Sequence, residues 1–348
     1  MTLKLCLVSE AIKAPFDEGV KLFAYNLIKE FSAKFEVLGI GRSNDFRGGI
    51  EKFCTNALPR NKLFLSLHLR KKLRSFRPDI IYYLPTAHAT LNSFFRAKVL
   101  KIYSNYAKVV MITLQPRKYS ALSKRIISLI APDLVLAQSK KTEEVLIGLG
   151  CRVKKIPSGI DLQKFVPVSK EVKEKLREKH GIPINKNIVL HVGHINRNRN
   201  MQFMMKIQEL DNLQAVIVGS TSYPEESHLV KELQEKGVIV LTRYIENIEE
   251  IYQSADCYIF PVFSDGACIE IPLSVLEAMA CNLPVLTTKF GGLPDFISEQ
   301  EGFIYANSNE DLIGKLDSVR CTLNPQTRKI VERYSWETVI REIISVSL

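Results

Sequence analysis

The chain has 348 residues, of which 46% are hydrophobic, and this length suits two domains that each bury a core. Seven cysteines without CxxC spacing argue against a disulfide framework or a zinc site and favour a reducing compartment. The opening MTLKLCLVSEA leads into a strand rather than a signal peptide, and no apolar run has the roughly 18 residues that would suggest a membrane span.

The net charge of +11 is unevenly distributed. Residues 1–200 hold 37 Lys/Arg and 15 Asp/Glu, whereas residues 201–348 hold 11 and 22. A strongly basic half favours an anionic partner, such as a membrane surface, nucleic acid or an acidic substrate. A basic, solvated surface without a partner is the alternative.

The first half alternates apolar strands with helices. The pattern predicts strands at 3–8, 35–40, 79–84, 109–114 and 134–137, and an amphipathic helix at 20–32. Gly19 precedes that helix, where a glycine permits close approach of the backbone to a ligand, although many such glycines only make turns. Ligands of open α/β sheets bind beyond the carboxyl ends of the strands. The candidate ligand-binding residues of this half, which would face an acceptor if the protein transfers a group, are therefore those that follow these strands: His88, Gln115, Arg117 and Ser139.

Residues 60–77, RNKLFLSLHLRKKLRSFR, are the most basic segment. Leucines recur among the cations at nearly helical spacing, which is typical of an interfacial helix on an anionic membrane. An ordinary crossover helix with a solvated basic face would give the same pattern. Nucleic-acid binding is disfavoured, because no known module is present.

A second set of strands is predicted at 189–192, 215–219, 238–241 and 257–261. The first of these is followed by Gly193 and a basic loop that contains His194, Arg197 and Arg199. A strand, a glycine and a basic loop before a helix favour phosphate binding, since arginine contacts phosphate in a bidentate manner. A polar surface loop is the alternative.

Residues 261–295 read PVFSDGACIEIPLSVLEAMACNLPVLTTKFGGLPD. Pro272 fits the first position of a helix over 273–281, which is apolar on nearly every side and should therefore be buried. Glu277 lies in the middle of that helix, and a buried carboxylate needs a partner. The amides of Leu273 and Ser274 suit a phosphate. With Glu270 just before the helix, the stretch suits a sugar nucleotide.

This stretch resembles the donor-site signature of the family 4 (group 1) retaining glycosyltransferases, which have the GT-B fold. The match covers EAMA at 277–280 and PVL at 284–286. The family's first glutamate, eight places before the second, is Ile269 here, and we expect Glu270 to take its role by a local shift. The segment IPSGID at 156–161 resembles the family's hinge, and the helix that begins near 334 resembles the one that crosses back to the first domain.

The resemblance implies an α/β protein with two Rossmann-like, doubly wound domains that face a cleft. Residues 1–165 would bind the acceptor, residues 166–333 the nucleotide-sugar, and residues 334–348 would return to the first domain. His194 and Arg199 stand where the family has cations that grip the donor diphosphate. The resemblance also places Gly19, Gly219 and Ile245 around the donor, with Ile245 near the base.

The implied activity is transfer of a sugar, with retention, from a nucleotide-diphosphate-sugar to a glycan or lipid-linked acceptor. Glu277 would hold the ribose and Glu270 the sugar ring, while Arg199 and Arg197 would stabilise the departing diphosphate. We expect no metal, no cofactor and no nucleic acid, and a cytoplasmic protein at the inner face of the membrane. A GT-B-type sugar-nucleotide epimerase and a basic nucleic-acid-binding α/β protein are the alternatives.

Overall fold

The computed structural model describes residues 3–86, 88–220, 226–322 and 324–348. The chain forms two compact units. The N-terminal unit comprises Met1–Gly159, Cys268–Ile271 and Trp336–Leu348, and the C-terminal unit comprises Ile160–Ala267 and Pro272–Ser335. The units part after Gly159, whereas the sequence placed a domain boundary after 165. The assignment of Cys268–Ile271 to the N-terminal unit was not foreseen.

The N-terminal unit is built on a parallel sheet of seven strands in the order β3-β2-β1-β4-β5-β6-β7. Each strand is a short apolar run, as expected of a parallel sheet that helices cover on both faces. The strands are β1 (Lys4–Ser9), β2 (Glu36–Gly41), β3 (Cys54–Asn56), β4 (Ile80–Leu84), β5 (Lys108–Ile112), β6 (Leu134–Ala137) and β7 (Val153–Lys155).

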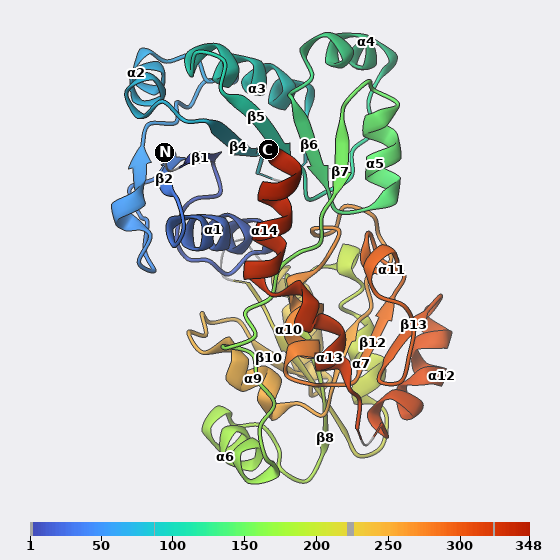
Figure 1. Cartoon of the computed structure of the whole chain (residues 1–348). Helices are drawn as coiled ribbons and strands as arrows, with labels where there is room; N and C mark the ends of the chain where they lie inside the picture. The colour runs from blue at the N-terminus through green and yellow to red at the C-terminus, as the bar shows by residue number, and fades with distance from the viewer. Residues whose placement is uncertain (1–2, 87, 221–225, 323) are drawn as a thin grey trace. The chain divides into compact units, whose positions relative to one another are not determined.

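Helices cover both faces of this sheet (Figure 1). They are α1 (Gly19–Ser32), η1 (Glu51–Phe53), α2 (Leu67–Phe76), α3 (Leu91–Tyr103), α4 (Ala121–Ile130), α5 (Lys140–Ile147) and α14 (Trp336–Ser347). One core contains buried side chains of α2, α3, α4 and α5 together with Val8, Tyr83 and Met111 of the strands. On the other face, Phe31 of α1 packs its ring 4.9 Å from that of Tyr82.

The C-terminal unit has six parallel strands in the order β10-β9-β8-β11-β12-β13. They are β8 (Asn187–Val192), β9 (Leu213–Val218), β10 (Ile239–Leu241), β11 (Cys257–Phe260), β12 (Val285–Thr288) and β13 (Phe303–Ala306). Both sheets have the strand order of a doubly wound fold, with a reversal at β1/β4 and at β8/β11. The predicted pair of Rossmann-like sheets is therefore confirmed.

The helices of the C-terminal unit also form two layers (Figure 1). They are α6 (Lys170–His180), η2 (Arg197–Arg199), α7 (Phe203–Gln208), α8 (Ser227–Glu235), α9 (Ile248–Ser254), α10 (Leu273–Ala280), α11 (Leu293–Phe296), α12 (Asn309–Arg320), α13 (Thr327–Val331) and η3 (Glu332–Tyr334). Phe203 of α7, Leu229 of α8 and Leu312 of α12 pack on one face of the sheet. On the other face, Tyr252 of α9 lies 5.9 Å, ring to ring, from Tyr258 of β11.

Two local predictions were wrong. The basic helix begins at Leu67 rather than at residue 60, because Asn61 hydrogen-bonds through its side chain to the backbone of Leu65 and holds a turn there. Ser66 then caps the helix. Pro272 is the N-cap of α10, with extended backbone (ψ 122°), rather than its first helical residue. Among the described residues, no helix is long and apolar enough to cross a membrane.

Candidate functional site

The carboxyl ends of β8 and β11 are the natural ligand position in the C-terminal unit. These strands are neighbours at the reversal of strand order, where doubly wound folds bind their ligands. Gly193 follows β8, and residues 261–267 follow β11 and lead toward α10. The topology therefore brings Gly193 and the loop 261–267 to the carboxyl end of this sheet.

Three features hold Arg199 at the carboxyl end of this sheet. Its backbone N–H donates to the Asn196 side chain at 2.9 Å, and its Nε donates to the Ala267 carbonyl at 3.1 Å. A Cβ placed on Gly193 would lie only 2.5 Å from Nη1 of Arg199, so the glycine makes room for the guanidinium. The structure thus brings Gly193 and Arg199 together and buries the arginine.

Arg197 points elsewhere. Its guanidinium pairs with Glu232 of α8 at 3.0 Å, and its backbone N–H donates to Glu226 at 3.2 Å. More than half of its side chain is exposed. The suggestion that Arg197 joins Arg199 on a diphosphate therefore finds no support in its contacts. His194 is half-buried.

His191 is a neighbour of this site that the sequence analysis missed. It is fully buried in β8, and its Nδ1 lies 3.0 Å from the Ile259 carbonyl. Burial lowers the pKa of His191 to about 3, so the ring is neutral, and the carbonyl assigns its proton to Nδ1. Nε2 has no hydrogen-bond partner among the described residues and lies 3.1 Å from a Cβ placed on Gly193. A lone histidine in the apolar run NIVLHV was the available signal.

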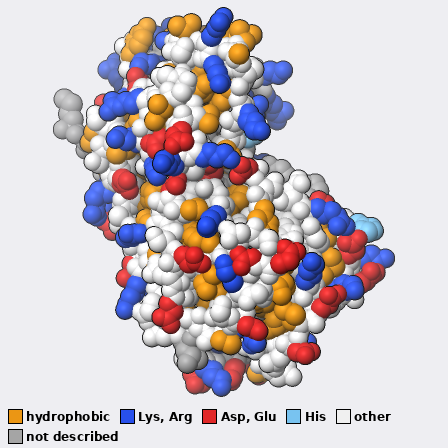
Figure 2. Space-filling view, turned by 90° about the vertical axis from the view of Figure 1, so that its right-hand side faces the viewer, with side chains coloured by type: hydrophobic (Ala, Val, Ile, Leu, Met, Phe, Trp, Pro, Cys, Tyr) orange, Lys and Arg blue, Asp and Glu red, His pale blue; other side chains and the backbone are white. Residues whose placement is uncertain are grey.

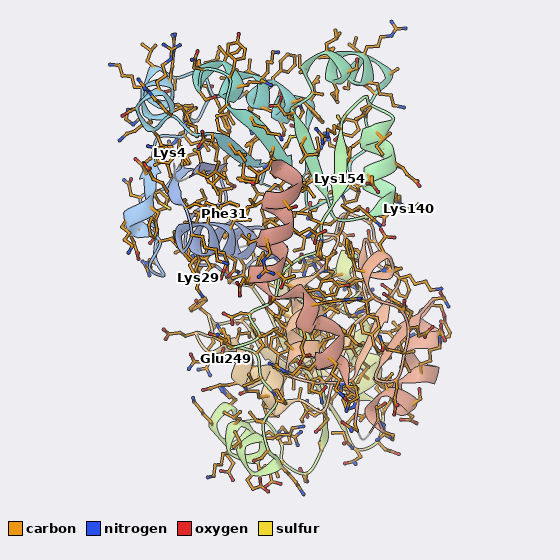
Figure 3. All side chains as sticks on the ribbon, viewed as in Figure 1. Lys4, Lys29, Phe31, Lys140, Lys154 and Glu249 are labelled. Atoms are coloured by element: carbon orange, nitrogen blue, oxygen red, sulfur yellow. The ribbon has the colours of Figure 1, made fainter. Side chains whose placement is uncertain are left out.

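Glu277 is buried in α10, with 7% of its surface exposed. Tyr252 donates its hydroxyl to Oε2 at 2.6 Å. Burial raises the pKa of Glu277 to about 7, although the hydrogen bond from Tyr252 opposes this. The negative charge of Glu249, which is labelled on α9 in Figure 3, raises the pKa of Glu277 by a smaller amount. The Tyr252 hydroxyl thus supplies one of the hydrogen bonds that the buried Glu277 carboxylate needs. Because its pKa is about 7, the Glu277 side chain is partly ionised near pH 7.

The start of α10 offers backbone amides. Pro272 has no side chain that could cap the helix, and the first intrahelical contact runs from Val275 N–H to the Pro272 carbonyl at 3.2 Å. Leu273 and Ser274 therefore occupy the first turn, where backbone N–H groups lack helical acceptors. The helix end can complement an anion at this position.

Glu270 belongs to the N-terminal unit, whereas Glu277 belongs to the C-terminal unit. Oε1 of Glu270 accepts hydrogen bonds from Ser139 Oγ at 2.5 Å and from Thr142 Oγ1 at 2.8 Å. Only 2% of its surface is exposed. These contacts to protein hydroxyls differ from the sugar contacts that the sequence predicted for this residue. Gly19 also lies in the N-terminal unit, where it faces Ile269.

A hollow of about 230 Å³ lies beside the loop that follows β10. Ile245 is part of its lining, as are Tyr244 and Arg243 from the same loop. Glu250 lies in the wall, where it binds Lys179 at 2.7 Å and His180 at 2.8 Å. Gly219 lies next to the end of β10, where its N–H donates to the Leu241 carbonyl at 2.8 Å.

Two of the acceptor-side candidates meet in the N-terminal unit. Arg117 contacts His88 through a hydrogen bond between Nη1 and Nε2. Burial and the adjacent guanidinium lower the pKa of His88. Gln115 follows β5 beside them, and its carbonyl accepts from Thr113 at 3.2 Å. Ser139 instead caps α5 and donates to Glu270.

Glu10 is a second residue that the sequence analysis missed. It follows β1, forms an ion pair with Arg42, and lies 3.7 Å from Arg96. Its carboxylate also accepts from Thr86 at 3.4 Å. An acidic residue directly after the first strand was the signal, but its partners come from distant parts of the chain.

Sequence models of one glycosyltransferase group match most of the chain. "Glycosyltransferase Family 4" matches residues 18–164, and "Glycosyl transferases group 1" matches residues 172–333. The chain belongs to this family of glycosyltransferases. Its two Rossmann-like sheets are those of the GT-B fold. Among its described residues, no group of three or more His, Cys, Asp or Glu side chains is placed to hold a metal ion.

Individual relatives are distant. The chain is 26% identical over 306 residues to the sulfoquinovosyl transferase SQD2 of Arabidopsis thaliana, across 81% of the chain and 58% of that protein. It is 24% identical over 230 residues to the D-inositol 3-phosphate glycosyltransferase of Corynebacterium jeikeium, across 59% of the chain and 54% of that protein. The chain thus spans little more than half the length of these relatives.

Solved structures share the fold over the full length. Anabaena HepE, determined in complex with UDP-glucose, aligns with a TM-score of 0.75 and 16% identity over 99% of each chain. The sucrose-phosphate synthase of Thermosynechococcus elongatus aligns with a TM-score of 0.77 and 17% identity over 99% of this chain and 98% of that one.

Proposed function

We propose that this protein transfers a sugar from a nucleotide-diphosphate-sugar to a glycan or lipid-linked acceptor, and that its C-terminal unit binds the donor. The observation that carries the proposal is the buried arginine at the β8/β11 switch point. Arg199 is fixed by the Ala267 carbonyl and has its guanidinium against Gly193. A buried, pre-positioned arginine without a carboxylate ion pair among the described residues is suited to an anionic ligand.

The proposed role of each donor-site residue follows from where negative charge forms during the transfer. As the bond between the sugar and the diphosphate breaks, negative charge grows on the leaving phosphate. Arg199 and the amides of Leu273 and Ser274 are fixed donors that stabilise this charge without reorganisation. Glu277 accepts hydrogen bonds from the ribose hydroxyls in its ionised form. His194, Gly219 and Ile245 complete the donor site, with Ile245 toward the base.

The N-terminal unit is proposed to bind the acceptor. His88, Gln115 and Arg117 lie beyond the ends of β4 and β5, and Glu10 adds a carboxylate beyond β1. Its lowered pKa keeps His88 neutral, with Nε2 accepting from Arg117, so the pair can position a hydroxyl group of the acceptor. We further propose that the anomeric configuration is retained and that no metal takes part, as is usual in the family that the sequence resembles.

The relatives support this substrate class. HepE was solved with UDP-glucose, which favours a nucleotide-sugar donor. A mannosyltransferase of Corynebacterium glutamicum is named for GDP-mannose and a monoacylated phosphatidylinositol monomannoside, which favours a lipid-linked acceptor. These names set the classes to be tested, namely uridine and guanosine diphosphate sugars with lipid-linked or free glycans.

Substitution of the two donor-site residues tests the proposal. We expect Arg199→Ala to lower the rate of transfer at least about a hundredfold, since the loss of one donor to a developing anion has this effect in other enzymes. We expect Glu277→Ala to lower the rate as well, because the ribose hydroxyls lose their acceptor. Arg197→Ala is the matched control, because that arginine pairs with Glu232 on the surface. Near-normal turnover by both site variants with an intact fold would refute the assignment.

We also propose that the N-terminal unit binds an anionic membrane at the inner face, with the protein located in the cytoplasm. Residues 52–132 contain 16 Lys/Arg and a single acidic residue, Asp79. α4 exposes Leu122 (69%) and Leu129 (81%) on one face with Arg125 between them. Figure 2 shows Lys and Arg side chains interspersed with hydrophobic ones on the face of the unit that carries α4. Exposed leucines beside cations complement acyl chains and anionic headgroups.

Co-sedimentation with vesicles tests this surface. The wild type should bind vesicles that contain anionic phospholipid at low salt and lose binding as salt rises. Leu122→Ser/Leu129→Ser should weaken binding about tenfold or more, because two inserted side chains are lost. Ile184→Ser, at an exposed position of the C-terminal unit, is the control. Absence of binding at low salt, or equal binding by both variants, would refute the proposal.

A further inference from the structure

The segment Cys268–Ile271 is built into the N-terminal unit by its backbone. Glu270 N–H donates to the Leu114 carbonyl at 2.8 Å, beyond the end of β5. Ile271 receives two further contacts: its N–H lies 3.4 Å from Gln138 Oε1, and Ser158 Oγ donates to its carbonyl at 3.2 Å. Gln138 and Ser158 are fully buried, so these are interior contacts.

The side chains of Ile269 and Glu270 in this segment also contact the N-terminal unit. A Cβ placed on Gly19 would lie 2.8 Å from Cδ1 of Ile269, so the glycine at the start of α1 admits this side chain. The Glu270 carboxylate accepts from Ser139 and Thr142 in the first turn of α5, which Lys140 marks in Figure 3. A carboxylate at a helix N-terminus is favoured by the helix dipole.

Both ends of the segment continue into the proposed donor site. Ala267, the residue before it, supplies the carbonyl that accepts from Nε of Arg199. Pro272, the residue after it, is the N-cap of α10, whose first turn offers amides to the diphosphate. Along the chain, the four residues therefore join the two groups that are proposed to hold the leaving phosphate.

We propose that Glu270 is a positioning residue: it fastens the segment Cys268–Ile271, which joins Ala267 to Pro272 along the chain, to the first turn of α5. The anchor itself follows from the contacts above, whereas its consequence for transfer rests on the proposed function. This assigns Glu270 to holding protein hydroxyls, in place of the sugar hydroxyls expected from the sequence.

Thr142→Val is the sharpest test, because it removes one hydroxyl donor to Glu270 and leaves the cap from Thr142 N–H to Ser139 Oγ in place. Glu270→Ala removes the whole anchor, and Glu270→Gln keeps an Oε1 that accepts from both hydroxyls. Thr322→Val is the matched control, since the Thr322 hydroxyl donates to the Ser318 carbonyl, four residues earlier in the C-terminal unit. Hydrogen exchange of peptides that span 264–272 is the readout that does not depend on activity.

We expect exchange in 264–272 to rise about tenfold or more in Glu270→Ala and by less in Thr142→Val, with Glu270→Gln close to wild type. The kcat for transfer should fall in the same order. Thr142→Val should add nothing in the Glu270→Ala background. Wild-type exchange in both Glu270→Ala and Thr142→Val would overturn the anchor.

A second result would also overturn the inference. If Glu270→Gln were as inactive as Glu270→Ala and exchange stayed at the wild-type rate, the carboxylate would act on the substrate directly. If no nucleotide-sugar supported transfer by the wild type, the proposed function would fail, and the exchange measurements would still decide whether Glu270 anchors the loop.

Discussion

The buried carboxyl group of Glu277 should make the protein less stable at alkaline pH, and Glu277→Gln should remove this penalty. Burial raises the pKa of Glu277 from 4.5 to about 7. Below about pH 4.5 the group is protonated in the folded and the unfolded chain and contributes no pH dependence. As the pH rises toward 7, the unfolded chain releases the proton while the folded chain keeps it, so the free energy of unfolding falls.

The size of the effect follows from the shift. Each pKa unit corresponds to about 1.4 kcal/mol, so a carboxyl whose pKa rises from 4.5 to about 7 loses about 3 kcal/mol of stability above pH 7. Glutamine has nearly the same shape, carries no charge, and keeps an oxygen that accepts from the Tyr252 hydroxyl. We therefore expect Glu277→Gln to be more stable than wild type by about 3 kcal/mol at pH 8.5 and by less than about 1 kcal/mol at pH 5.

Urea denaturation followed by circular dichroism at the two pH values measures this difference. Trp336 is the single tryptophan and lies in the N-terminal unit, so its fluorescence shows whether that unit is unaffected. Glu332→Gln, at an exposed position, is the control and should change stability equally little at both pH values. A Glu277→Gln effect that is the same at pH 5 and pH 8.5 would refute the reasoning, because an amide and an ionising carboxyl would then behave alike.

Two further predictions concern the same site. Donor binding should tighten between pH 6 and pH 8 in the wild type, because ribose hydroxyls donate to the ionised form of a group whose pKa is about 7, and titration calorimetry at several pH values should show this dependence disappear in Glu277→Gln. Gly193→Ala should weaken nucleoside diphosphate binding about tenfold or more, because the added Cβ would lie 2.5 Å from Nη1 of Arg199 and displace the guanidinium. Gly314→Ala is the control, since a Cβ at Gly314 would have no atom within 4 Å. Equal affinity of the two variants for nucleoside diphosphate would contradict the packing argument.

The sequence was most informative where function depends on contiguous residues. The apolar run 257–260, Pro272 and the EAMA helix all lie within residues 257–280, and they predicted a buried helix with a carboxylate in it. The alternation of strands and helices was enough to predict two doubly wound sheets, because parallel strands need helical crossovers and leave few other arrangements.

What the sequence could not show depends on residues that are far apart. The contacts of Glu10 with Arg42 and Arg96, and of Glu270 with Ser139 and Thr142, join separate elements. Arg197 and Arg199 look equivalent in the loop RNRN, but η2 directs one to Glu232 on the surface and the other into the interior. A short polar motif does not show which way each side chain points, because the conformation of a single backbone turn determines the direction.

The central claim is that Arg199 and Glu277 bind the nucleotide part of a sugar donor, and calorimetric titration with nucleoside diphosphates tests it most directly. One of the common diphosphates should bind the wild type with micromolar affinity. Arg199→Ala and Glu277→Ala should each weaken this binding about tenfold or more, and Arg197→Ala should not. Binding that is unchanged in both site variants, or absent for every diphosphate with the wild type, would contradict the account.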